Sequence, residues 1–375
     1  MFTWPRFLAV LIKEFVQMRR DRLTFAMMIG VPIMQLVLFG YAINTDPKAL
    51  PAAVVSAESS VFSRSFVRAL ENTGYFRIVA QPRTVDEADR LIADGEVQFV
   101  LHLPEDFSRR IQRGERPVVL VEADATDPAA TGNAIAALQG LNATSIDRDL
   151  AGPLAGARAG PAPFEVRVHK RYNPDGITQF NIVPGLMGVV LTMTMIMMTS
   201  IAMTRERERG TMENLLATPV TPFEVMLGKI VPYILVGYVQ VIVILLAAKF
   251  LFAVPMVGSL ALLSAVLVLF IAANLAIGFT FSTMAKSQMQ AMQMTMFFFL
   301  PSMLLSGFMF PFRGMPGWAQ VLGEVFPLTH FLRIVRGIML KGSDAAAILP
   351  NLWPLALILV VVSTAAMLRY NRTLD

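Results

Sequence analysis

The sequence predicts an α-helical polytopic membrane protein with six transmembrane helices, an N-terminal interfacial helix and an external α/β domain. The first observation is composition: the 375 residues are 55% hydrophobic and only 16% charged, whereas soluble proteins carry roughly a quarter charged residues. The second is that six segments are long and apolar enough to cross a hydrocarbon core of ~30 Å. The third is a stretch of soluble composition, residues 44–178, between the first two of these segments.

The six predicted spans follow from length and hydropathy. They are residues 24–43, 181–203, 230–250, 257–284, 293–310 and 349–368. The fifth is short and contains Pro301, which predicts a broken or tilted helix. Residues 179–375 thus carry the second to sixth spans, with a loop at 204–229 and, on the opposite side, an interrupted helical segment at 311–347.

Lysines and arginines in the short loops predict the orientation. More of them fall on the side of the N-terminus, so both termini are expected in the cytoplasm and residues 44–178 in the periplasm or outside the cell. The inner side holds Arg6, Lys13, Arg19, Arg20, Arg22, Arg205, Arg207, Arg209, Lys229, Lys286, Arg369 and Arg372, and the short outer loops hold Lys249, Arg313, Arg333, Arg336 and Lys341.

Residues 1–23 have the pattern of an amphipathic helix. Phe7, Leu11 and Phe15 recur at helical spacing, opposite Lys13 and Arg20. Such a helix lies on the inner membrane surface and leads into the first span. A simple topogenic anchor is the alternative interpretation, and a cleavable signal is not expected because no small-residue cleavage site follows the first apolar run.

Residues 44–178 predict an α/β domain with a mixed sheet. The segment 97–103 alternates, with Val97, Phe99, Leu101 and Leu103 expected on one face, and 164–170 alternates in the same way. The other expected strands are 52–56, 77–81 and 118–123, and helical patterns occupy 59–71, 84–94, 105–113 and 127–151.

Several classes of site are not expected. The chain has no cysteine and three separated histidines, which argues against thiol chemistry and a metal centre. Asp124 and Asp127 could hold a cation, but Asp127-Pro128 also matches a helix cap. His169 is expected to be solvated. Basic residues are spread along the chain, so nucleic-acid binding is not expected either.

The stretch RERERGTMENLLATPVTPFE, residues 205–224, interrupts two apolar runs. Its charges must lie outside the hydrocarbon, and their alternating signs allow a helix to extend out of the second span. Gly210 ends that helix and Thr211 can cap a short new one, with Glu213 in its first turn. Leu215 and Leu216 then form an apolar knob. A docking element for a soluble partner, a helix on the lipid surface and a solvated loop are the three interpretations.

Longer stretches carry a family resemblance. RERERGTMENLLATPVTPFEVMLGKIVPY, RYNPDGITQFNIVPGLMGVVLTMT and FPLTHFLRIVRGIMLKG resemble ABC transporter permeases of the type-2 exporter class. The resemblance covers the whole chain and is strongest to a bacterial drug-exporter-like subgroup with a large external domain. It implies the inner membrane, a second permease subunit (identical or related) and cytoplasmic ATPase chains; a periplasmic adaptor is a further candidate partner.

The resemblance also implies residue roles. This chain has no GxxxxGK[ST] loop, so it is not expected to be an enzyme or to bind a cofactor, and ATP and Mg belong to the partner ATPase. The connecting helix would be residues 2–22, the main coupling helix would span 205–217, and 285–291 would make a second contact. The implied coupling residues are Arg205, Glu206, Arg207, Glu208, Arg209, Gly210, Thr211, Glu213, Leu215, Leu216 and Lys286.

In the resembled family the second and fifth spans line the pathway, and here both spans are rich in methionine. Flexible, polarizable methionine suits surfaces that accept varied apolar ligands; packing between helices or against lipid is the alternative. No charge lies deep in either span, which favours an apolar or amphipathic, drug-like or lipid-like substrate. The expected pathway residues are Met187, Leu191, Thr194, Met195, Met198, Met294, Phe297, Phe298 and Pro301.

Residues 311–347 predict short helices at the outer headgroup level. Phe331, Arg333 and Arg336 suit that level, with the arginines snorkelling, and Glu324 is expected either to gate an exit or to be a solvated or paired acid. A membrane receptor with an external ligand-binding domain is the alternative function, but its output domain would have to fit within inner segments no longer than 204–229. An ATP-independent transporter would need an internal repeat or ionisable residues in the spans.

Overall fold

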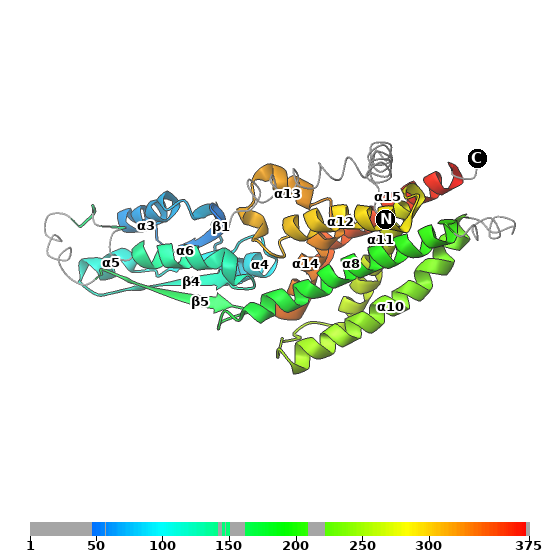
Figure 1. Ribbon diagram of the computed structural model, residues 1–375. Coiled ribbons are helices and arrows are strands. Elements are labelled where there is room, and N and C mark those ends of the chain that lie inside the picture. The colour runs from blue at the N-terminus through cyan, green and yellow to red at the C-terminus, as the bar shows by residue number, and fades with distance from the viewer. Residues whose placement is uncertain are drawn as a thin grey trace, which may run out of the picture.

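The computed structural model describes residues 47–56, 58–141, 145–146, 148–150, 162–208 and 222–372. It joins an α/β domain to a bundle of long helices, and α8 leads directly from the sheet into that bundle (Figure 1). The expected interfacial helix 1–23, the expected first span 24–43 and residues 209–221 lie outside the described residues.

The α/β domain contains a five-stranded mixed sheet in the order β2-β1-β3-β4-β5, as the sequence predicted. β1 is parallel to β2 and β3, β4 is antiparallel to β3, and β5 is parallel to β4. The strands are β1 (Leu50–Ser56), β2 (Phe76–Ala80), β3 (Phe99–Leu103), β4 (Val118–Asp124) and β5 (Glu165–Arg171).

Helices cover both faces of this sheet. On one face, the Phe164 ring packs edge to face with Phe66 and Phe107, at 5.2 and 5.6 Å between centroids. On the other face, Ile92 packs with Val97, Val100 and two alanines. The helices are α3 (Val61–Asn72), α5 (Phe107–Gln112) and α6 (Pro128–Leu141) on the first face and α4 (Val85–Ala93) on the second.

Two details of the domain differ from the sequence prediction. Val97 precedes β3 and packs with Val100 on the α4 face, not with Phe99 and Leu101, because alternation applies only within the strand. The helix expected at 127–151 ends at Leu141, one residue after Gly140, which is a weak helix former, and residues 145–146 and 148–149 are turns.

Four described helices are long and apolar enough to cross a membrane: Thr178–Arg205, Tyr233–Phe250, Leu260–Met284 and Ala345–Arg369. They agree with the second, third, fourth and sixth predicted spans. The complete helices are α8 (Thr178–Glu208), α10 (Pro222–Phe250), α11 (Leu260–Met284) and α15 (Ala345–Arg372).

The predicted fifth span, 293–310, is displaced by five residues toward the N-terminus, with no change in length. Its helix, α12 (Gln288–Leu305), begins at the Ser287 cap, whose Oγ accepts a hydrogen bond from the Gln290 amide. It ends before Gly307, whose positive φ of 86° turns the chain away. Because its first turns are polar, the mean hydropathy of α12 is too low for it to count among the four apolar spans. Pro301 lies inside the helix without ending it.

α11 lies at the centre of the bundle and packs against α8 and α15. It is apolar around its whole circumference, as expected for a buried helix, with Phe270, Leu275 and Phe279 fully enclosed. Gly278 permits a close approach to α8, because a Cβ there would lie only 2.6 Å from the Ile196 carbonyl oxygen.

The segment 311–347 is more deeply buried than predicted. α14 (Pro327–Arg336) packs against α8 and α11, and Phe331 is fully buried, with its ring stacked on Phe270 at 4.0 Å between centroids. Arg333 and Arg336 turn toward protein groups and do not snorkel. The segment also contains η3 (Phe312–Gly314), α13 (Gly317–Gly323) and the π-helical η4 (Gly337–Lys341).

Candidate functional site

The charged end of α8 is fixed to the start of α12. The Glu208 carboxylate accepts hydrogen bonds from the backbone N and side-chain Nε2 of Gln288, at 2.7 and 2.5 Å. Arg205 Nε donates to Gln288 Oε1 at 3.4 Å. The hydrogen bonds from Gln288 hold the pKa of Glu208 below its ordinary value. Since Glu208 binds a free amide at a helix N-terminus, it acts as a second cap for α12.

This contact joins the two segments in which ATPase coupling was expected. The helical extension of α8 reaches Glu208, as its alternating charges predicted. Lys286 lies in the turn before α12, where its backbone N donates to Gln290 Oε1 at 2.5 Å. Gln288 was not predicted, because only the folded chain brings it to Glu208. Arg209, Gly210, Thr211, Glu213, Leu215 and Leu216 lie outside the described residues, as do the side chains of Glu206 and Arg207.

The expected pathway residues divide into two groups. Met187, Leu191 and Met195 are fully buried in the bundle core, where they pack between helices. Thr194, Met294, Phe298 and Pro301 are partly buried, and Met198 and Phe297 are exposed in the described part of the chain.

Exposed apolar stripes run along α8 and α12. On α8, Ile182, Leu186, Val190, Thr194 and Met198 recur every four residues, and all but the half-buried Thr194 are exposed. Thr194 Oγ1 donates to Gln240 Oε1 of α10 at 2.9 Å.

On α12, Met289, Met292, Met296 and Phe297 are exposed in the same way. A buried contact of 3.2 Å between Ser200 Oγ and Thr295 Oγ1 holds the two helices together. Leu186 and Val190 were not singled out from the sequence, although their helical spacing contained the pattern, whereas Met292 and Met296 belong to the methionine-rich stretch at the start of the predicted fifth span.

The α/β domain contacts the helices through polar and charged groups, among them Asp124 at the end of β4. Lys341 Nζ binds Asp124 Oδ2 at 2.6 Å, and both side chains are largely buried. Arg313 Nη2 donates to the Gly95 carbonyl oxygen at 2.6 Å, and Asn181 Nδ2 donates to Asp127 Oδ1 at 3.3 Å. The cation beside Asp124 is therefore a lysine, and no cluster of metal-ligating side chains is found among the described residues.

A second buried carboxylate, Glu122 of β4, joins side chains of the neighbouring strands β3 and β5. It contacts Arg171 at 2.7 Å and His102 at 3.1 Å, and Arg171 also binds Asp89 at 2.6 Å. Burial raises the pKa of Glu122, but the hydrogen bonds and charges of Arg171 and His102 outweigh it and hold that pKa below its ordinary value. His169 is exposed, as predicted, and lies 3.5 Å from Glu122. This cluster is fully paired, which indicates a structural role.

Glu324 is the paired acid that the sequence allowed as one alternative. Its carboxylate binds Arg333 at 2.6 Å, and Arg333 also contacts Asn351 at 3.3 Å and lies 4.5 Å from the centre of the Phe312 ring.

Comparison with known proteins agrees with this architecture. The family model described as "ABC-2 family transporter protein" matches residues 22–368. The probable multidrug ABC transporter permease YbhS of Escherichia coli K12 is 28% identical, over 100% of this chain and 98% of that protein. YbhR of the same organism, with the same description, is 26% identical over 96% of each chain. The inner membrane transport permease YhhJ is 28% identical over 91% of this chain and 93% of its own.

Proposed function

Because the chain belongs to the ABC-2 family of transporter proteins, we propose that it is the permease subunit of an ATP-driven exporter. Relatives that match it over nearly their whole length are described as permeases of ABC transporters, which supports this role. Two permease chains, identical or related, form the pathway through the bacterial inner membrane. Separate cytoplasmic ATPase chains bind ATP and Mg²⁺, and this chain itself is not an enzyme.

The proposal includes an orientation. Both termini and residues 205–224 lie in the cytoplasm, and the α/β domain lies in the periplasm, where an adaptor could dock on it. The excess of lysine and arginine on the side of the N-terminus supports this arrangement.

The contact between Glu208 and Gln288 carries the coupling part of the proposal. Residues 205–217 are proposed to receive the movement of the ATPase. Because Glu208 binds both the backbone and the side chain of Gln288, a displacement of the α8 end would pull directly on the first turn of α12. α8 and α12 also carry the exposed apolar stripes, so movement at the cytoplasmic end would change the surface proposed to line the pathway.

The side chains on those stripes favour an apolar or amphipathic substrate, drug-like or lipid-like. Exposed methionine and phenylalanine provide adaptable apolar contact. α8 contains no charged residue between Thr178 and Thr204, and α12 contains none at all. A highly charged molecule would find no compensating group along these helices.

Reconstitution with the partner ATPase tests the proposal. Leu215→Asp removes the apolar knob and Gln288→Ala removes the side-chain contact to Glu208. Both chains should insert and assemble, but dye-stimulated ATP hydrolysis and export of a fluorescent amphipathic dye from proteoliposomes should fall by roughly tenfold. Gln288→Ala loses a hydrogen bond to a charged group, and Leu215→Asp loses the apolar contact of one leucine side chain.

Glu115→Gln, an exposed acid of the α/β domain, is the matched control and should behave as the parent chain. Unchanged coupling in both test variants would refute the coupling role. Absence of any ATPase from purified complexes would refute the permease assignment.

A further inference from the structure

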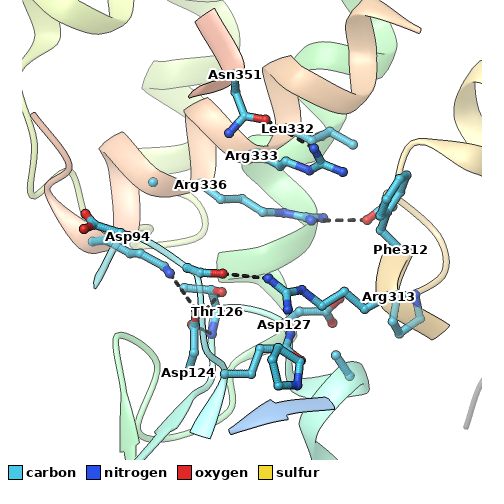
Figure 2. Close-up of a pocket in the computed structure, with 18 of the residues that line it drawn as sticks. Asp94, Asp124, Thr126, Asp127, Phe312, Arg313, Leu332, Arg333, Arg336 and Asn351 are labelled. Carbon is cyan, nitrogen blue, oxygen red and sulfur yellow. Dashed lines mark hydrogen bonds and ion pairs between the residues drawn. The ribbon is translucent and has the colours of Figure 1, made fainter. Parts of the chain in front are cut away.

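A cavity of about 710 Å³ lies where the α/β domain meets the ends of the membrane helices. Its walls come from β4 and the loop after α4 on one side, and from η3, α14, η4 and the start of α15 on the other (Figure 2). This volume is typical of sites that hold an organic molecule. Part of the lining is apolar, including Pro311, Phe312, Leu332 and Ile348.

The charged groups of this lining are mostly basic. The cationic residues are Lys48, Arg77, Arg313, Arg333, Arg336 and Lys341, and the acidic residues are Asp94, Asp124 and Asp127. Some of the cations are already neutralised: Lys341 is paired with Asp124, and Arg333 is paired with Glu324, each at 2.6 Å.

Arg336, by contrast, has guanidinium nitrogens without a hydrogen-bond partner among the described residues. Its Nη1 donates to the Gly307 carbonyl oxygen at 3.2 Å. Its Nε and Nη2 are buried from water and have no hydrogen-bond partner among the described residues. Burial lowers the pKa of Arg336, and the nearby charge of Asp127 opposes that effect only in part. A guanidinium remains charged even so, and a buried charge without full hydrogen bonding is costly.

Arg313, on η3, enters the same cavity as Arg336 of α14. Figure 2 shows its side chain and that of Arg336 extending into the space between η3, α14 and the loop after α4. Its Nη2 donates to the Gly95 carbonyl oxygen at 2.6 Å. Surrounding protein and the like charge of Arg333 lower the pKa of Arg313, Asp124 opposes them, and Arg77 adds to the lowering. The Arg313 side chain is exposed to water and lines the cavity, so it is available to a ligand.

These two arginines require a ligand with enough acceptor oxygens to bind both guanidinium groups. Each has a backbone carbonyl as its hydrogen-bond acceptor, and they enter one cavity from two different elements, η3 and α14. A carboxylate has two oxygens and matches a single guanidinium fork, whereas a phosphate has enough acceptor oxygens to bridge two guanidinium groups.

We propose that this cavity binds a phosphate group, with Arg336 and Arg313 as its ligands. The cavity is larger than a phosphate, and its apolar lining would contact the rest of a phosphate-bearing molecule such as a phospholipid headgroup. Free phosphate offers the same chemistry. The proposal goes beyond the transport function, and its test requires no ATPase, so failure here leaves the permease assignment intact.

The test uses the purified full chain and two probes. Native mass spectrometry measures phosphatidylglycerol carried from mixed vesicles of phosphatidylglycerol and phosphatidylcholine. Thermal shift in sodium phosphate, against sodium chloride at equal ionic strength, measures inorganic phosphate. Binding of at least one probe should be saturable and weakened roughly tenfold or more by Arg336→Gln and by Arg313→Gln.

Arg109→Gln, at an exposed ion pair with Asp106, is the control and should bind as the parent does. Arginine-dependent binding of the lipid identifies a headgroup as the source, and arginine-dependent binding of the inorganic ion identifies free phosphate. The proposal is overturned if neither probe binds saturably, or if the variants bind as tightly as the control. Arg313→Gln, at an accessible side chain, keeps the test decisive if Arg336→Gln does not fold.

Discussion

The ion pair between Lys341 and Asp124 should hold the α/β domain against the helices, and Asp124→Asn tests this directly. The pair spans 2.6 Å, and its side chains are only 12% and 8% exposed. Removing one partner of a buried pair costs about 3–5 kcal/mol. The lower end applies here, because Lys341 keeps the Ile92 carbonyl oxygen at 3.3 Å and the Tyr172 ring at 5.1 Å. Asparagine can also keep the hydrogen bonds that Thr126 donates to Asp124.

Hydrogen exchange in the full chain in nanodiscs measures the effect. A loss of about 3 kcal/mol corresponds to roughly 150-fold faster exchange through local opening of β4 and η4. Exchange in the last turns of α11, at the opposite end of that helix from the residues that hydrogen-bond to η4, should not change. Lys341→Met should have a comparable effect, and the double variant should lose less than the sum of the two single variants, because the second change removes no remaining pair.

Arg167→Gln provides the matched control, since its ion pair with Glu165 is exposed and should contribute no measurable protection. Two results would refute the reasoning. One is less than roughly threefold faster exchange of β4 and η4 in Asp124→Asn, since threefold is only about 0.65 kcal/mol. The other is strict additivity in the double variant.

Two further predictions concern packing and pH. Gly278→Ala places a Cβ 2.6 Å from the Ile196 carbonyl oxygen, so the thermal midpoint of the full chain in detergent should fall, by an amount equivalent to about 1–3 kcal/mol. Gly132→Ala, where no atom lies within 4 Å of the added Cβ, should not lower it, and equal midpoints would contradict the close packing of α8 and α11. Because the folded pKa of Glu122 is lowered, its stabilising contribution is present above its ordinary, unfolded pKa and is lost as the pH falls through the lower folded pKa. Glu122→Gln should remove that part of the acid dependence of the α/β domain, measured by circular dichroism, and an unchanged acid profile would show that the cluster contributes nothing.

Features that depend on short stretches of chain could be predicted from the sequence. α11 was recognisable because it is apolar all round, and β3 because its apolar residues alternate. The helical extension to Glu208 followed from charges that the hydrocarbon cannot accept. In each case the physical cause acts within one turn or one strand of the residue concerned.

Features that depend on what covers a surface could not be predicted. α14 has an apolar side and two arginines, a pattern that fits equally well on a membrane surface or inside a bundle. The fold places Phe331 on Phe270 and turns Arg336 into a cavity. The position of α12 was also missed, because its end is determined by the turn at Gly307 and its start by the Ser287 cap, while hydropathy responds only to the apolar middle.

The sequence by itself determined that this chain is a membrane protein with an α/β domain inserted after its first predicted span, since hydropathy and periodicity are properties of contiguous residues. The tertiary structure alone decided which distant polar groups meet. Glu208 reaches Gln288 across 80 residues, and Lys341 reaches Asp124 across 217. Arg336 and Arg313 line one cavity for the same reason: the packing of helices and sheet sets distances between side chains that no local pattern encodes.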